Sequence, residues 1–254
     1  MKETIAENIF RLTIPFEDIY TTVYLIKHED GDILFDTATY PRDIENYIIP
    51  FIKSHDAELK FVFLSHDHGD HAGGLETLLK YYPSVRVISR SQEIKENFAS
   101  FDIHIPQDGE EFAEGFKTVT IEGHSYDSMG LLDIQKRILI SGDSLQLYGI
   151  YGSGEWGANV KLVEEHIKAI NKLRTMDIES IYAAHDYHPM GYAYIGKENI
   201  TKAFDFCLEP LYRIKKLMKA FPEKNDVEIR EIYQKEKLPT VKLPVFAAVR
   251  ETEM

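Results

Sequence analysis

The chain has 254 residues, of which 44% are hydrophobic and 28% charged, a composition typical of a globular protein with a substantial core. Its formal net charge of −13 at pH 7 disfavours nucleic acid as a partner, because neutralising many phosphates needs clustered Lys and Arg. The single cysteine, Cys207, excludes an intramolecular disulfide and a cluster of thiolate ligands. Any bound metal must therefore rest on His, Asp or Glu.

The first half of the sequence alternates strand and helix patterns. β-Branched and aromatic runs predict strands over residues 9–14, 22–27 and 32–36, with Asp30-Gly31 as the turn before the third, so a β-meander opens the chain. Apolar spacing predicts a helix over residues 43–54, in which Pro50 is a point of ending or kinking. A buried strand at 60–64, a helix from 72 to 80 and a strand at 85–89 follow.

The second half repeats this alternation. It predicts strands at 118–121, 131–134, 137–140 and 178–184, and helices at about 159–174 and 198–221, with Pro210 as a conflict inside the last helix. Residues 148–157 are rich in Gly and aromatic side chains and fit neither pattern, which indicates a loop.

The segment SHDHGDH, residues 65–71, holds three of the ten histidines directly after the predicted strand at 60–64. In an irregular loop, two histidines that are two residues apart can face one point, while the following Asp-His pair turns toward a second point nearby. Neutral imidazole and carboxylate groups suit zinc, iron or manganese. The segment therefore predicts a cradle for two metal ions.

SHDHGDHAGG, residues 65–74, resembles the H-x-H-x-D-H signature of the metallo-β-lactamase superfamily. Three later motifs resemble the rest of that family's pattern in chain order: Gly123-His124-Ser125, Gly142-Asp143-Ser144 and Ala184-His185-Asp186. Carried over residue by residue, the resemblance implies one metal on His66, His68 and His124, a second on Asp70, His71 and His185, and Asp143 between them. It also implies that Asp36 supports the site without binding a metal; Ala38 stands where the family usually has Gly.

The resemblance covers about residues 9–190 and implies an α+β fold, the four-layer αβ/βα sandwich. Two mixed β-sheets are expected face to face, with helices on the outer faces and the metals at one rim. Residues 1–195 are expected to form the catalytic core, and residues 196–254 a C-terminal helical extension packed on the same domain.

The ligand set implies two divalent ions, with zinc expected and iron or manganese left open. A metal-bound hydroxide would attack an ester-like bond in a lactone, thioester or carboxylic ester, and Asp70 would orient the water. The core resembles that of glyoxalase II and the lactonases, although no recognisable glutathione-binding pattern is present. Candidate substrate contacts are Tyr151 and Trp156, in a segment that is either a lid or an ordinary loop, and Tyr194.

Other branches of the family fit less well. An Asp at position 143 and a lone, distant cysteine disfavour antibiotic hydrolysis, and the negative charge disfavours a nuclease. Redox members with two irons typically carry Glu where His68 stands. A non-hydrolytic member, either an iron-dependent redox or oxygen enzyme or a metal-binding protein without turnover, remains the alternative.

The expected partner is a small-molecule substrate, with neither nucleic acid nor membrane. A homodimer is compatible with the sequence, which does not fix the oligomeric state. The N-terminal segment lacks a basic region followed by an apolar run, and no eighteen apolar residues follow one another, so a cytoplasmic location is expected.

Overall fold

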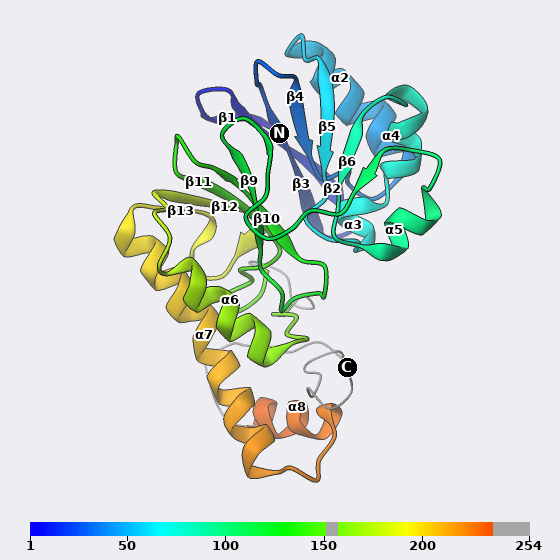
Figure 1. Ribbon diagram of the computed structural model, residues 1–254. Coiled ribbons are helices and arrows are strands. Elements are labelled where there is room, and N and C mark those ends of the chain that lie inside the picture. The colour runs from blue at the N-terminus through cyan, green and yellow to red at the C-terminus, as the bar shows by residue number, and fades with distance from the viewer. Residues whose placement is uncertain (151–156, 236–254) are drawn as a thin grey trace. The chain divides into compact units, whose positions relative to one another are not determined.

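A computed structural model describes residues 1–150 and 157–235 (Figure 1). The chain divides into two compact units, Met1–Val119 and Thr120–Met254. The predicted boundary near residue 195 is a different division, and it stays a prediction.

A seven-stranded mixed sheet lies in the first unit. In spatial order it contains β1 (Lys2–Ala6), β2 (Ile9–Phe16), β3 (Ile19–Ile26), β4 (Asp32–Phe35), β5 (Leu59–Phe63), β6 (Arg86–Ile88) and β7 (Ile103–His104). The strands from β1 to β4 pair antiparallel, and those from β4 to β7 pair parallel. The parallel half requires crossover connections, which the helices supply.

The crossovers of the first unit contain α1 (Pro41–Asp43), the π-helix η1 (Ile44–Ile48), α2 (Ile49–Ser54), α3 (Gly69–Ala72), α4 (Leu75–Tyr81) and α5 (Gln92–Asn97). Figure 1 shows α2, α4 and α5 on one side of β4, β5 and β6. Side chains alternate along each strand, so every second residue, such as Val62 and Leu64, joins a core with Ile48, Phe51 and Leu78 of these helices.

The opposite face of this sheet is aromatic. Phe35 and Phe63 stack with ring centroids 5.2 Å apart, and Phe112 packs edge-on against Phe61 at 5.5 Å. Phe112 belongs to β8 (Glu111–Ala113), which pairs with β9 (Phe116–Thr120). Apolar side chains thus pack on both faces of the sheet, which explains the continuous apolar runs at residues 33–35 and 61–63.

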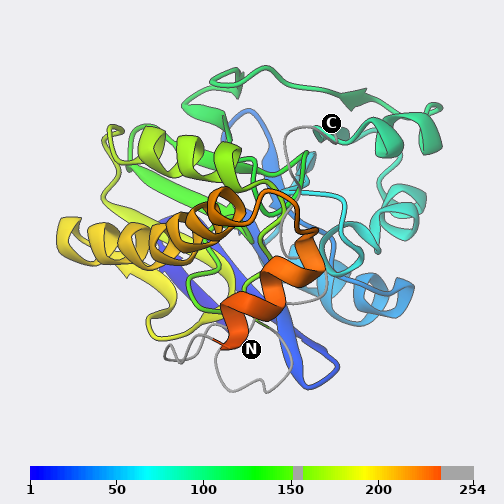
Figure 2. The ribbon, with the colours of Figure 1, turned by 90° about the horizontal axis from the view of Figure 1, so that it is seen from below.

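The second unit carries β10 (Met129–Asp133), β11 (Ile138–Gly142), β12 (Ser180–Tyr187) and β13 (Gly191–Ile195), and the helices α6 (Val163–Leu173), α7 (Lys197–Ala220) and α8 (Asp226–Lys235). β11 and β12 are parallel, whereas β10 and β13 pair antiparallel with their neighbours. Figure 2 shows α6 beside α7, with α8 against the later part of α7. The full six-stranded order is β13-β12-β11-β10-β9-β8.

Two mixed sheets with accompanying helices confirm the predicted fold class. Some elements that the sequence did not indicate, such as β7 and β8, are two or three residues long, too short to show a period. Longer elements, namely β1, α5, β13 and α8, were missed as well. Pro50 does not end its helix: the π-helical segment Ile44–Ile48 precedes it, and α2 continues to Ser54. Pro210 lies inside α7, which runs through it without interruption. Within residues 1–150 and 157–235, no helix is long and apolar enough to cross a membrane.

Candidate metal centre

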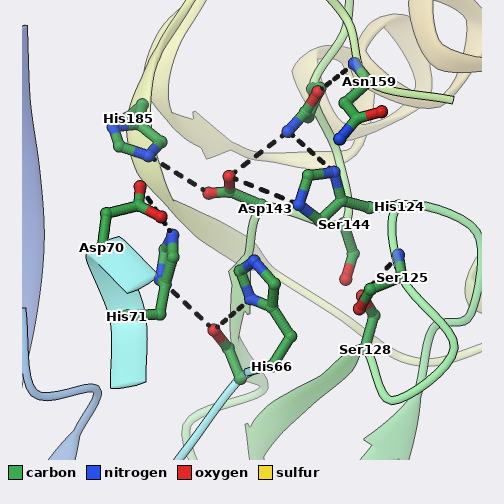
Figure 3. A network of polar contacts seen from close by, with 12 residues as sticks. His66, Asp70, His71, His124, Ser125, Ser128, Asp143, Ser144, Asn159 and His185 are labelled. Atoms are coloured by element: carbon green, nitrogen blue, oxygen red, sulfur yellow. Dashed lines mark hydrogen bonds and ion pairs between the residues drawn. The ribbon is translucent and has the colours of Figure 1, made fainter. Parts of the chain in front are cut away.

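Four predicted ligands follow β5 in the first unit. His66 and His68 lie in a loop, whereas Asp70 and His71 lie on α3, so the expectation of an irregular loop throughout is wrong for its second part. The helix forms because the His68 carbonyl accepts the N–H groups of His71 and Ala72. The His66 ring centroid lies 4.5 Å from that of His68 and 4.2 Å from that of His71. Oδ2 of Asp70 lies 3.3 Å from Nε2 of His71 (Figure 3).

Asp36 is fully buried and accepts three hydrogen bonds. The donors are the Ser65 N–H at 2.7 Å, the Ser65 hydroxyl at 2.9 Å and His71 Nδ1 at 2.7 Å. Asp36 follows β4 and Ser65 follows β5, so both lie at the carboxyl ends of adjacent parallel strands. Burial raises the pKa of the Asp36 carboxyl, against the lowering effects of His71 and Ser65. These contacts orient the His71 ring, as the predicted supporting role requires.

Gly73 and Gly74 allow α3 and α4 to lie close to residues 37–39, the turn that follows β4 (the β4 turn). A Cβ added at Gly74 would lie 2.2 Å from the Thr37 carbonyl oxygen, and one at Gly73 would lie 2.3 Å from that of Thr39. Both obstacles are backbone atoms that cannot swing away. Ala38 itself has φ of +55°, a left-handed conformation that Gly adopts more readily than Ala.

We expect Gly74→Ala to lower the free energy of unfolding of the metal-free protein by at least about 2 kcal/mol, because the β4 turn must shift to admit the methyl group. Gly69→Ala is the matched control: it lies in the same segment, at the start of α3, and its Cβ would meet nothing within 4 Å. Urea unfolding of both variants measures the difference. Equal stability of the two would contradict the packing described for α3 and α4.

The second unit carries the other three predicted ligands. His124 lies in the connection between β9 and β10, Asp143 follows β11, and His185 lies in β12. Oδ2 of Asp143 is 3.7 Å from His124 Nε2, and its Oδ1 is 3.4 Å from His185 Nε2 (Figure 3). All three side chains are buried. β12 continues two residues past His185, beyond the predicted strand end, because Tyr187 pairs with Gly191 of the unpredicted β13.

Gln146 contacts two of these ligands. Its buried amide nitrogen donates to Asp143 Oδ2 at 3.3 Å and lies 3.0 Å from His124 Nδ1. Its amide oxygen accepts the Asn159 N–H, which fixes the orientation of the amide group. Sequence reasoning missed Gln146, as it missed the role of Ser65, because a lone polar residue near a motif carries no periodic or spacing signal.

The residues proposed for substrate contact stay predictions. Tyr151 and Trp156 lie outside the described residues, as does most of the candidate lid. Tyr194 is fully buried, and its hydroxyl donates to the Leu145 carbonyl at 3.5 Å. Burial raises the pKa of Tyr148, at the start of that segment, to about 12, with Glu209 adding to the effect.

The chemistry of the donor set fits divalent ions. The seven side chains offer imidazole nitrogens and carboxylate oxygens, and they include neither a thiolate nor a cation. Zinc, iron and manganese all accept such ligands, and buried carboxylates beside buried imidazoles are the usual setting of such sites.

Comparison with known proteins gives a family match. The family model described as the metallo-beta-lactamase superfamily matches residues 17–185. A hydroxyacylglutathione hydrolase of Vibrio cholerae is 28% identical over 176 residues, 68% of this chain and 63% of that protein. An atrochrysone carboxyl ACP thioesterase of Emericella nidulans is 27% identical over 168 residues, 65% of this chain and 51% of that protein. The chain thus spans between half and two thirds of the length of these relatives.

A solved structure shows the same fold. The metallo-beta-lactamase FIM-1 from Pseudomonas aeruginosa in its mono-zinc form superposes with a TM-score of 0.63 at 16% identity, covering 83% of this chain and 96% of that one.

Proposed function

The chain belongs to the metallo-beta-lactamase superfamily, and on this basis we propose that it is a dinuclear metal-dependent hydrolase of an ester-like bond. The observation that carries the proposal is that every ligand position of the family's motif is filled by a side chain able to bind a metal, with its supporting carboxylate, Asp36, in place.

We propose the assignment of ligands that the family's motif implies. The first metal would be held by His66, His68 and His124, and the second by Asp70, His71 and His185, with Asp143 shared between them. Zinc is the proposed ion, by ligand chemistry and by the zinc form of the FIM-1 structure. When bound, the ions would polarise the scissile carbonyl and lower the pKa of water toward neutrality.

The protein's own groups would orient the reaction. Asp70 is partly exposed, with 19% of its side chain accessible, so its carboxylate can accept a hydrogen bond from the attacking water. His71 cannot rotate while Asp36 holds its Nδ1 at 2.7 Å. Asp143, tied to Gln146, keeps one carboxylate oxygen toward each histidine of its unit. Preorganised in this way, the ligands need no rearrangement during the reaction.

A thioester is the first substrate class to test, with lactones and carboxylic esters beside it. The names of the two relatives above, a hydroxyacylglutathione hydrolase and an acyl-carrier thioesterase, support this order. The acyl group would come from a small molecule. Three of the α7 cations, Lys202, Arg213 and Lys215, each pair with a Glu, which argues against them as an anion site.

The proposed activity is tested with protein stripped by a chelator and then reloaded with zinc. We expect the reloaded enzyme to hydrolyse at least one substrate in a panel of acyl thioesters, lactones and esters, and the stripped enzyme to hydrolyse none. Turnover that is unaffected by chelation would contradict metal dependence. Bound iron with a redox-sensitive spectrum and no hydrolysis would favour redox or oxygen chemistry, and metal binding without either would favour a binding role.

A further inference from the structure

The start of α6 contacts both ligand-bearing turns of the second unit. The N–H groups of Lys161 and Leu162 donate to the Gly123 carbonyl at 3.0 and 2.9 Å. Gly123 directly precedes His124. Through Asn159, the same segment also fixes the Gln146 amide that donates to Asp143. A single helix entry is therefore attached to the neighbours of two proposed ligands.

His166, on the first turns of α6, joins the same two places. It is 4% exposed, and its Nε2–H donates to the Ser144 carbonyl at 2.7 Å. Its ring lies against Gly123, where an added Cβ would come within 2.1 Å of the His166 Cγ. Ser144 directly follows Asp143. The imidazole thus lies between the turn that carries His124 and the turn that carries Asp143.

The polar atoms of His166 indicate that this side chain does more than pack against its neighbours. Burial lowers its pKa to about 4, so the ring is neutral near pH 7. Nδ1 is buried and has no hydrogen-bond partner among the described residues, which costs free energy that an apolar side chain of similar size would not incur. What histidine adds at this position is the N–H group that holds the Ser144 carbonyl.

We propose that His166 is a positioning residue that fixes the separation of the His124 and Asp143 turns and so sets the affinity of the site for its metals. The inference rests on the proposed function only in assuming that these two residues bind metal. His166 does not touch the metals or substrate and acts through Ser144 and Gly123.

Two substitutions separate the N–H group from the packing. His166→Phe keeps a flat ring against Gly123 and removes the donor, whereas His166→Gln keeps a donor at a similar reach. Lys168→Ala is the matched control, because Lys168 lies on the exposed face of the same helix, where it pairs with Glu165.

Zinc and cobalt dissociation constants are measured by competition with a chelator, together with the absorption spectrum of the cobalt-loaded protein. We expect His166→Phe to weaken metal binding about tenfold and to change the cobalt spectrum. His166→Gln should recover most of the affinity, and Lys168→Ala should match the parent. Parent-like affinity and spectrum in folded His166→Phe would overturn the proposal.

A measurement on the unsubstituted protein covers the case in which His166→Phe does not fold. Nuclear magnetic resonance of the histidine side chains should show a His166 Nε2–H that exchanges slowly with solvent, in both metal-free and zinc-loaded protein. A rapidly exchanging proton, or a proton on Nδ1 instead, would overturn the proposal. None of these readouts measures turnover. A protein that binds metal but hydrolyses nothing would therefore refute the proposed function, while the metal-binding and exchange measurements would still test the role of His166.

Discussion

Replacing Asp143 by Ala is expected to lower hydrolysis at least about 10³-fold and to reduce the metal content below two per chain. The reason is that both carboxylate oxygens face proposed ligands: Oδ1 faces His185, and Oδ2 faces His124. Removing the carboxylate would take away the anionic group that is proposed to be shared by the two metals. Elemental analysis and steady-state kinetics measure the two effects.

Asp133→Ala provides the control for this substitution. Asp133 is also a buried carboxylate, at the end of the neighbouring β10, but among the described residues it accepts hydrogen bonds only from the backbone and ammonium groups of Lys136. We expect it to lower stability and leave metal content and turnover unchanged. If Asp143→Ala retains two metals and parent-like turnover, its proposed place between the metals is refuted.

Replacing Asp36 by Ala is expected to cost about 3 kcal/mol of stability in the metal-free protein and to weaken metal binding as well. The substitution leaves the Ser65 N–H, the Ser65 hydroxyl and His71 Nδ1 in a fully buried place without their acceptor. It also frees the His71 ring to rotate. Urea unfolding and chelator competition separate the effect on stability from the effect on the ligand.

β4 offers a closely matched control at its opposite end. Asp32 is 2% exposed and likewise accepts three hydrogen bonds, from Lys27, the His28 N–H and the Glu58 N–H. Asp32→Ala should therefore cost a similar free energy of unfolding without altering metal affinity. If both variants weaken metal binding equally, the effect of Asp36 is one of general stability, and its specific support of His71 is refuted.

The parts of the fold that the sequence predicted are those with a clear period or a long apolar run. The apolar run at residues 60–64 corresponds to β5, and the helical spacing at residues 198–221 corresponds to α7. In such segments the pattern of buried side chains, on one face or on both, determines the secondary structure. β13 was missed: its residues 191–195 are partly exposed, and the pairing with β12 that forms the strand is a tertiary contact. That contact also extended β12 past His185.

The candidate site shows the same division. The seven proposed ligands could be named from the sequence because their residue types and order resemble a known signature, and their metal binding stays a proposal. Gln146 and His166 could not, since their roles depend on contacts such as the 2.7 Å hydrogen bond from His166 to Ser144, across 22 residues of sequence. Asp36 is an intermediate case. The sequence indicated it as a supporting residue, but its three hydrogen-bond donors could be identified only from the pairing of β4 with β5 in the structure.

The central claim, that the seven proposed ligands hold two metal ions per chain, is tested most directly by counting metals. Protein purified without a metal-affinity tag should contain about two divalent ions per chain by elemental mass spectrometry, either as isolated or after reloading a stripped sample with zinc. A site that stays empty after reloading, or that never holds more than one ion per chain, would contradict the account.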